Sequence, residues 1–195
     1  MDAVYRFDFS VLEALQGIHS PVLDVIMKFF TYAGNGAIIW AAAAVILLCI
    51  KRTRHIGNGL FIAMALDGII NELIIKNLVQ RDRPFVQNPL VDTIVGQPSS
   101  YSFPSGHTCT AFASATVIFF FNKRWGIVAY VTAALIGFSR NYFYIHFPTD
   151  VLCGALEGLI LGTAAVLILT RFFIKRVEDE PAPEAESTEA PEDLS

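Results

Sequence analysis

Apolar runs separated by short polar clusters dominate this chain up to residue 176. Five of these runs cover residues 37–50, 56–78, 108–121, 125–138 and 151–174. A helix needs roughly 20 predominantly apolar residues to cross a bilayer, and tilt or local thinning of the bilayer accommodates other lengths. The pattern therefore predicts an all-α, polytopic membrane bundle of about six transmembrane helices, five of them formed by these runs.

The two N-terminal segments are less regular. Charges at Arg6, Asp8 and Glu13 interrupt the apolar residues of 4–18, which favours a helix lying in the membrane interface over one that crosses it. The apolar run at 21–32 is short and contains two charges. Two outcomes stay open for this run, because it either crosses the bilayer with tilt or remains half-buried.

Composition supports a membrane protein. Only 16% of the 195 residues are charged and 54% are hydrophobic, whereas a soluble domain carries about a quarter charged residues. Residues 1–18 lack the basic start, apolar core and small-residue cleavage site of a signal peptide. The three cysteines all lie in apolar runs, so we interpret them as packing residues rather than as disulfide partners.

The charges are segregated along the chain. Residues 177–195 hold eight acidic side chains and no basic one, which leaves 14 basic against 10 acidic side chains in residues 1–176. The acidic segment also holds three prolines and cannot bury enough apolar surface to fold. We therefore expect a membrane-embedded domain at 1–176 and a disordered acidic tail at 177–195.

Basic residues predict the orientation of the helices. If each run crosses once, one side of the membrane collects three basic groups, at residues 52–54, 123–124 and 171–176. The excess of Lys and Arg in cytoplasmic loops assigns this side, and with it the tail, to the cytoplasm. The opposite, extracytoplasmic side then collects a second set: Lys76, Arg81, Arg83, His107, Arg140 and His146. These cations oppose the orientation rule, so they need a separate explanation.

The first of three polar stretches contains Lys76, Arg83 and Pro84. Lys76 and Arg83 are seven residues apart, so a continued helix would place them on one face, and Pro84 discourages further helix. Two fixed cations suit an anion with several oxygens, and the planar fork of arginine matches phosphate. The alternative is a basic anchor at the membrane surface.

The second stretch, Pro104-Ser105-Gly106-His107, opens an apolar run. Ser105 is well placed as an N-cap, which leaves the amides of Gly106 and His107 free to bind an anion at the helix start. A histidine in the first turn can donate a proton to a leaving group. By itself this stretch is weak evidence for a site, and a plain helix N-cap is the better interpretation.

The third stretch contains Arg140, His146, Pro148 and Asp150. Pro148 is expected in the first turn of the last helix, which places Asp150 in that turn as well. Asp150 follows His146 by four residues and can accept from one ring nitrogen, leaving the other unprotonated as a nucleophile or base. The alternative is the polar cap of a helix hairpin.

Together the three stretches supply three cations, a helix N-terminus and two histidines. In-line phosphoryl transfer needs charge neutralisation, an activated nucleophile and a proton donor for the leaving oxygen. The sequence contains no cluster of carboxylates that would hold Mg²⁺, so we expect neither a metal nor another cofactor.

The spacing of these residues resembles the three-part signature of the type 2 phosphatidic acid phosphatase superfamily. Eleven specified positions agree in order and spacing across 75 residues: Lys76, Arg83, Pro84, Pro104, Ser105, Gly106, His107, Ser139, Arg140, His146 and Asp150. The resemblance implies a six-helix membrane fold with a metal-independent site near the outer membrane surface. It also implies that His146 attacks phosphorus to form a phosphohistidine, that Asp150 orients His146 and that His107 protonates the leaving oxygen. The phosphate-binding residues implied are Lys76, Arg83, Ser105, Gly106 and Arg140.

We therefore expect a lipid phosphatase of the cell membrane, with a lipid phosphate as its partner and no nucleic acid. Undecaprenyl pyrophosphate, phosphatidylglycerol phosphate and phosphatidic acid are the candidate substrates. A phosphotransferase would use the same phosphohistidine with an acceptor other than water, and a transporter or scaffold would use the polar cluster for permeation or packing. We interpret Asp67, Glu72 and Glu157 as structural residues, and Glu72 can pair with Lys76. Arg81 contacts either substrate or solvent, and the sequence does not distinguish these alternatives.

Overall fold

The computed structural model describes residues 3–91 and 93–174, and all secondary structure in these ranges is helical. The predicted acidic tail at 177–195 lies outside the described residues. The elements are α1 (Ala3–Gln16), α2 (Pro21–Gly34), η1 (Asn35–Ala37), α3 (Ile38–Cys49), α4 (Arg54–Asp67), η2 (Gly68–Ile75), α5 (Lys76–Val79), α6 (Pro84–Gln87), α7 (Gly106–Phe121), α8 (Lys123–Tyr142), α9 (Pro148–Ile168) and η3 (Leu169–Ile174). The predicted all-α membrane class is thus confirmed.

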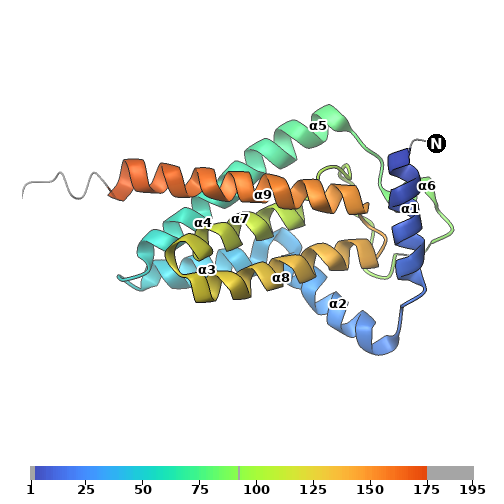
Figure 1. Ribbon diagram of the computed structural model, residues 1–195, viewed down its shortest axis with the longest axis horizontal. Coiled ribbons are helices and arrows are strands. Elements are labelled where there is room, and N and C mark those ends of the chain that lie inside the picture. The colour runs from blue at the N-terminus through green and yellow to red at the C-terminus, as the bar shows by residue number, and fades with distance from the viewer. Residues whose placement is uncertain (1–2, 92, 175–195) are drawn as a thin grey trace, which may run out of the picture.

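Helices α3, α4, α7, α8 and α9 lie along the long axis of the molecule, and α1 lies across one end of the bundle (Figure 1). Helix α7 is the central element and packs against α4, α8 and α9. Its sequence is rich in Ala, Ser, Thr and Gly, and these small side chains let the neighbouring helices approach closely. The centre of the bundle is therefore a small-residue helix surrounded by larger ones.

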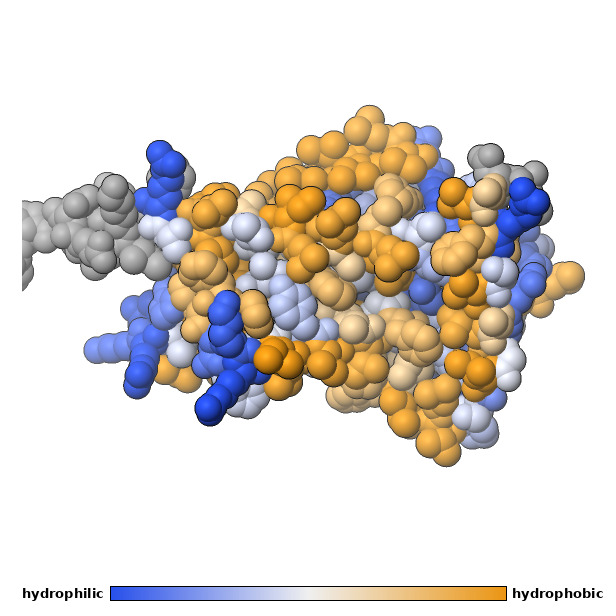
Figure 2. Space-filling model, in the orientation of Figure 1, coloured by the Kyte–Doolittle hydropathy of each residue, from blue (hydrophilic) through white to orange (hydrophobic). Residues whose placement is uncertain are grey.

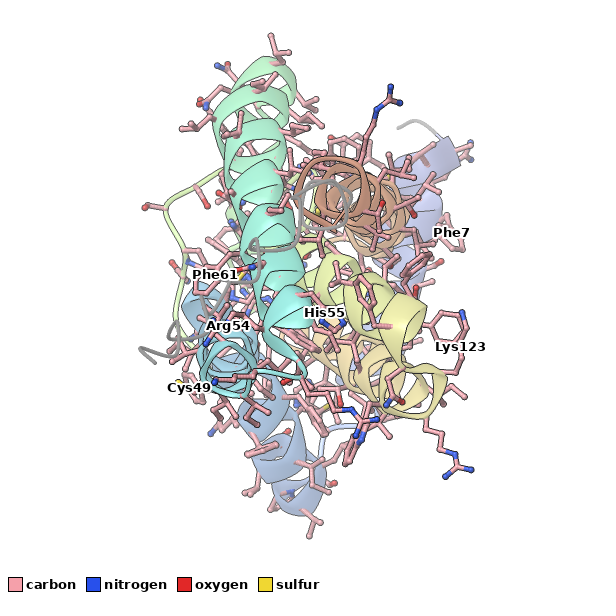
Figure 3. The ribbon with its side chains drawn as sticks, turned by 90° about the vertical axis from the view of Figure 1, so that its left-hand side faces the viewer. Phe7, Cys49, Arg54, His55, Phe61 and Lys123 are labelled. Carbon is pink, nitrogen blue, oxygen red and sulfur yellow. The ribbon has the colours of Figure 1, made fainter. Side chains whose placement is uncertain are left out.

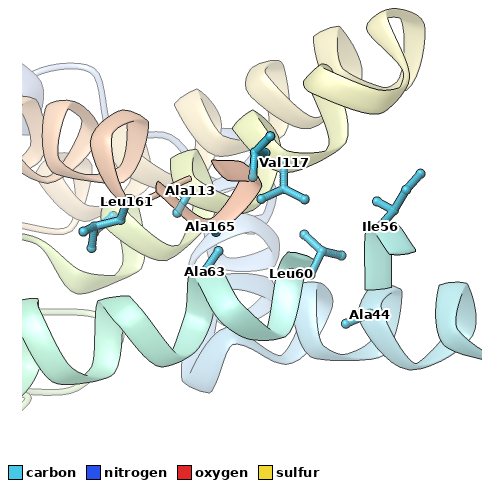
Figure 4. Close-up of a cluster of buried hydrophobic side chains, with 10 residues drawn as sticks. Ala44, Ile56, Leu60, Ala63, Ala113, Val117, Leu161 and Ala165 are labelled. Carbon is cyan, nitrogen blue, oxygen red and sulfur yellow. The ribbon is translucent and has the colours of Figure 1, made fainter. Parts of the chain in front are cut away.

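The main apolar core lies between α3, α4, α7 and α9 (Figure 4). It joins small side chains to branched ones: Ala44, Ile56, Leu60, Ala63, Cys109, Ala113, Val117, Leu161, Ala165 and Val166. Cys109 is fully buried in this core, whereas Cys49 and Cys153 are exposed, and all three are free thiols. The interpretation as a packing residue thus holds for Cys109, whereas Cys49 and Cys153 lie on the surface of the bundle.

Three glycines of α9 lie directly against α7. A Cβ added at Gly154 would lie 2.6 Å from the Ser105 carbonyl oxygen, and one at Gly162 would lie 2.6 Å from the Ala113 carbonyl oxygen. Real Cβ atoms essentially never come this close, so only glycine permits the two backbones to approach in this way. The four-residue spacing of Gly154, Gly158 and Gly162 thus forms the groove for helix packing that the sequence predicts.

Large exposed apolar side chains cover the middle of the bundle, and hydrophilic side chains gather toward its two ends (Figure 2). Three helical segments are long and apolar enough to cross a membrane, namely Pro21–Cys49, Arg54–Gln87 and Pro148–Arg171, and Gly106–Phe121 is apolar but shorter. This surface is what a multi-pass membrane protein presents to lipid.

The expected number of about six transmembrane helices is not confirmed. The runs at 21–32 and 37–50 fall in the apolar segment Pro21–Cys49, in which α2 ends at Gly34 and α3 begins at Ile38. The short element η1 joins α2 to α3, and both Gly36 and Ala37 adopt left-handed backbone angles there, with φ of 56° and 57°. The Gly34-Asn35-Gly36 sequence thus ends α2 and turns the chain into α3.

The two ends of the bundle differ. Arg54, His55 and Lys123 lie at the end opposite α1, where α3 meets α4 and α7 meets α8 (Figure 3). At the other end, α1 keeps Val4 and Phe7 exposed and buries Leu12 and Asp8. A short helix with one apolar exposed face that lies across the bundle agrees with the expected interfacial segment.

The glycine groove yields a stability prediction. In Gly158→Ala, the added methyl group would lie 2.5 Å from the Cys109 carbonyl oxygen, so α9 has to move away from α7. We expect a loss of about 1–3 kcal/mol and a lower thermal midpoint of the purified protein in detergent. The control is Gly68→Ala, whose Cβ meets nothing within 4 Å. Equal midpoints for the two variants would show that the groove is not a close-packed contact.

Candidate active site

The three polar stretches of the sequence converge at the end of the bundle that α1 covers. They arrive from the segment after α5, from the start of α7 and from the loop between α8 and α9. The Ser105 amide donates to the Asp150 carbonyl oxygen at 3.1 Å and so joins the beginning of α7 to the first turn of α9. This hydrogen bond thereby fixes the position of two residues that are 45 positions apart in the sequence.

His146 is 1% exposed and lies in the loop between α8 and α9. Its Nε2 lies 3.1 Å from Arg83 Nη1, and its Nδ1 lies 3.4 Å from Ser102 Oγ. A guanidinium only donates hydrogen bonds, so Nε2 has to be the acceptor and Nδ1 has to hold the proton of the neutral ring. The bonding pattern therefore leaves the Nε2 lone pair as the reactive position.

The backbone of this loop is also constrained. The amides of Ile145 and His146 both donate to the Arg140 carbonyl oxygen, at 3.0 and 3.3 Å. Tyr144 adopts a left-handed conformation with φ of 60°, which is unusual for a non-glycine residue. These bonds thus hold His146 close to Arg140, although six positions separate the two residues in the sequence.

Burial away from water lowers the pKa of His146 well below its ordinary value, and the positive charges of Arg83, Arg140 and Lys76 act in the same direction. Protonation would add a further charge to a site that is already cationic. The imidazole is therefore neutral at neutral pH, which is the form that a nucleophile or base requires.

Asp150 is fully buried, and its two oxygens have separate partners. Oδ2 accepts from Ser102 Oγ at 2.5 Å and from the Phe147 amide at 3.0 Å, and Oδ1 accepts from Arg81 Nη1 at 2.5 Å. The distance from Asp150 Oδ2 to His146 Nδ1 is 3.6 Å, longer than a hydrogen bond. Ser102 contacts both groups, so the serine hydroxyl connects the ring to the carboxylate.

Arg83 and Arg140 are buried cations. Arg83, 4% exposed, donates to the carbonyl oxygens of Ser100 and Tyr101 at 2.7 and 3.2 Å. Arg140, 3% exposed, donates to Thr31 Oγ1 at 2.5 Å, and its buried Nε has no hydrogen-bond partner within the described residues. Neither guanidinium forms an ion pair with a carboxylate in the part of the chain that the structure describes. Two buried charges without a counter-ion favour binding of an anion.

Lys76 has a carboxylate partner, as the sequence predicted. Its Nζ lies 2.6 Å from Glu72 Oε1, and Lys76 is buried whereas Glu72 is 43% exposed at its side chain. The Glu72 carboxylate also occupies the space that a Cβ on Gly106 would need, next to the Asn71 side chain. Glu72 therefore brings a negative charge to the N-terminus of α7, where the sequence predicts the phosphate.

The start of α7 agrees with its predicted position but not with its predicted cap. Ser105 is the N-cap residue, yet its side chain makes no capping bond and instead accepts from Thr108 Oγ1 at 3.0 Å. His107 Nε2 lies 2.8 Å from Asn35 Oδ1 in η1, so the ring donates its proton to the amide oxygen. The two histidines and the cations Lys76, Arg83 and Arg140 all lie within electrostatic reach of one another.

Asp67 and Glu157 lie outside this site, in the helical part of the bundle. Asp67 accepts from Thr110, and Glu157 Oε2 accepts from Asn71 Nδ2 at 2.8 Å. These contacts join α4 to α7 and η2 to α9, which agrees with the structural role that the sequence suggested.

Several residues at this site were not identified from the sequence. Ser102 lies just before the second stretch, Asn35 and Thr31 belong to a segment without a motif, and Asp8 interrupts the apolar residues of 4–18. The one available signal was a buried charge in an otherwise amphipathic helix, since Asp8 falls on the same side of α1 as Leu12.

The fold and the site together define a class: a multi-pass membrane protein with a buried, cationic anion site built around a neutral histidine. A family model described as the PAP2 superfamily matches residues 56–175. The chain belongs to this superfamily and is a membrane phosphatase. The resemblance found in the sequence is thereby confirmed.

Individual relatives agree with this assignment. An undecaprenyl-diphosphatase of Sulfolobus acidocaldarius is 31% identical over 174 residues, covering 88% of this chain and 83% of the relative. Phosphatidylglycerophosphatase B of Bacillus subtilis is 32% identical over 173 residues, 82% of each chain. The crystal structure of a transmembrane PAP2 type phosphatidylglycerolphosphate phosphatase from Bacillus subtilis has a TM-score of 0.73 at 25% identity, covering 93% of this chain and 90% of that chain.

The contacts of Ser102 lead to a prediction. Ser102→Ala removes the hydroxyl between His146 Nδ1 and Asp150 Oδ2, so the ring loses its link to the carboxylate. We expect kcat for phosphate release to fall about 10- to 100-fold while KM changes little, since Ser102 acts on the histidine rather than on the substrate. Ser99→Ala, an exposed serine in the same connector, is the matched control. Wild-type kcat in Ser102→Ala would refute this link.

Proposed function

We propose that this phosphatase hydrolyses a phosphate monoester or pyrophosphate bond on the head group of a membrane lipid, through a phosphohistidine on His146. The observation that supports it best is the pair of buried guanidiniums, Arg83 and Arg140. They lack carboxylate partners among the described residues and lie beside the unprotonated Nε2 of a neutral histidine. A phosphoryl group supplies the negative charge that these cations need and the electrophile that the imidazole needs.

In the first step, His146 Nε2 attacks phosphorus, an N–P bond forms and the bond from phosphorus to the leaving oxygen breaks. In the structure, Arg83 Nη1 donates to His146 Nε2. When the substrate binds, a phosphoryl oxygen accepts this hydrogen bond instead. Arg140, Lys76 and the amides at the start of α7 neutralise the charge on the transferring group, together with Ser105 and Gly106. His107 acts as an imidazolium, whose positive charge the bound phosphate stabilises, and it gives a proton to the leaving oxygen, so the lipid departs as an alcohol or as a shorter phosphate.

In the second step, water attacks phosphorus and the N–P bond breaks, which releases inorganic phosphate and restores His146. His107, deprotonated by the first step, accepts the proton of the attacking water. Asp150, acting with Ser102, stabilises the imidazole while it is positively charged or phosphorylated. These two steps use only side chains and amides of this chain, so we expect the reaction to proceed without a metal ion.

The place of the site in the bundle supports a lipid substrate. The site lies at the end that α1 covers, next to the apolar belt of Figure 2, so a head group can enter sideways while its tails stay in the bilayer. The basic side chains at the opposite end, among them Arg54 and Lys123, support an extracytoplasmic site and a cytoplasmic C-terminus. Undecaprenyl pyrophosphate, phosphatidylglycerol phosphate and phosphatidic acid remain the candidate substrates, and the first two match the names of relatives.

The test is phosphate release by the purified protein in detergent from each of the three lipids, with EDTA present. We expect release to survive EDTA and to fall at least about a thousandfold in His146→Ala, because the nucleophile is lost. His55→Ala is the matched control, since His55 lies at the far end of the bundle and packs on Phe121 (Figure 3). Release that requires a divalent metal, or that persists in His146→Ala, would overturn the mechanism. Transfer of labelled phosphate to a second molecule instead of water would identify a phosphotransferase.

The Glu72–Lys76 ion pair yields a further prediction. The Glu72 carboxylate occupies Lys76, so product phosphate has to displace it in order to bind there. The Glu72→Gln variant lacks this competing charge and should bind phosphate more tightly. We expect the inhibition constant of inorganic phosphate to fall about two- to fivefold, as befits a partly exposed pair. Glu13→Gln removes an exposed acidic charge from α1 and should leave phosphate inhibition unchanged. Equal inhibition constants for Glu72→Gln and the wild type would show that Glu72 does not compete with phosphate.

A further inference from the structure

A chain of ionic contacts connects the interfacial helix α1 to the Asp150 carboxylate. Asp8 of α1 is fully buried, and both of its oxygens are occupied. Oδ1 accepts from the Thr149 amide at 3.0 Å, and Oδ2 accepts from Thr149 Oγ1 at 2.7 Å and from Arg81 Nη2 at 2.6 Å. A carboxylate removed from water in this way is stable only because each of these donors is present.

Arg81 bridges the two carboxylates. Nη2 contacts Asp8, and Nη1 donates to Asp150 Oδ1 at 2.5 Å and to Thr149 Oγ1 at 2.8 Å. The guanidinium also lies over the Phe147 ring, 4.0 Å from its centroid, and 4.8 Å from that of Tyr5. Its planar fork is thus fixed on two carboxylates and two rings.

These contacts separate Arg81 from the cations of the phosphate site. Arg83 and Arg140 have no carboxylate within ion-pair distance in the described part of the chain, whereas Arg81 has two. The charge of Arg81 is therefore already balanced before a phosphate arrives. The sequence leaves open whether Arg81 contacts substrate or solvent. The structure shows instead that Arg81 contacts two buried carboxylates.

We propose that Asp8 and Arg81 act as one positioning unit, which holds Asp150 in the rotation that presents Oδ2 to Ser102 and His146. Anchoring Oδ1 on Arg81 leaves the carboxylate one orientation, and Asp8 in turn fixes the guanidinium from α1. The orientation of the catalytic histidine then depends on the seating of the interfacial helix. This inference rests on the roles proposed above for His146 and Asp150.

The test separates positioning from substrate binding by steady-state kinetics on the lipid that the wild type hydrolyses best. In Asp8→Asn and Arg81→Gln we expect kcat to fall about 10- to 100-fold, as for other residues that orient a catalytic group, with KM within about twofold of the wild type. Glu13→Gln, which alters an exposed acid of the same helix, should retain wild-type kcat. A raised KM with unchanged kcat in Arg81→Gln would mean that Arg81 binds substrate, and would overturn the proposal.

A double-variant cycle tests whether the two residues form one unit. If Asp8 acts through Arg81, the protein with both substitutions is no slower than Arg81→Gln alone, because the second change removes nothing that still operates. Losses that multiply would show two independent effects and overturn the unit. Where Asp8→Asn fails to fold, the isosteric Thr149→Val removes the hydroxyl that both Asp8 and Arg81 contact, and the same fall of kcat at constant KM is expected.

The outcome is distinguishable from failure of the proposed function. If His146→Ala keeps its activity, the phosphohistidine mechanism fails whatever the α1 variants do. If His146→Ala is inactive while Asp8→Asn and Thr149→Val are folded and keep wild-type kcat, the positioning unit alone is refuted.

Discussion

The structure of this protein depends on how positive charge is accommodated at one end of a membrane bundle. Arg83 and Arg140 are buried there without a carboxylate partner among the described residues, although removing a charge from water is costly. The surrounding groups reduce this cost only in part, through carbonyl oxygens and hydroxyls. In the function proposed above, the phosphoryl group of the substrate supplies the negative charge that these two cations lack.

Close packing of small residues makes such a site possible. The glycines of α9 bring its backbone against α7, and this contact joins Ser105 to Asp150 across the start of both helices. The loop between α8 and α9 that contains His146 is then held by bonds to the Arg140 carbonyl oxygen. Precision at the site thus comes from backbone contacts between helices, which shift less readily than long side chains.

The three arginines of the site show that the neighbours of a side chain decide its role. Arg81 and Arg83 are two residues apart in the sequence, yet Arg81 contacts two carboxylates while Arg83 contacts a histidine and carbonyl oxygens. Arg81 balances buried negative charge, whereas Arg83 has no carboxylate partner among the described residues. Both residues lie in the non-helical segment between α5 and α6, so their neighbours rather than a common helix face set their contacts.

The sequence by itself determined the helical membrane class, the family and the eight proposed site residues, because apolar run length and motif spacing are local properties of the chain. Pro148 and Asp150 in the first turn of α9 and the Glu72–Lys76 pair were likewise predictable, since they involve neighbours on one helix. Only the tertiary structure decided that Ser102, Asn35 and Asp8 contact the site. These contacts join residues more than 40 positions apart, and they depend on the rotation and depth at which helices pack, which no local pattern specifies.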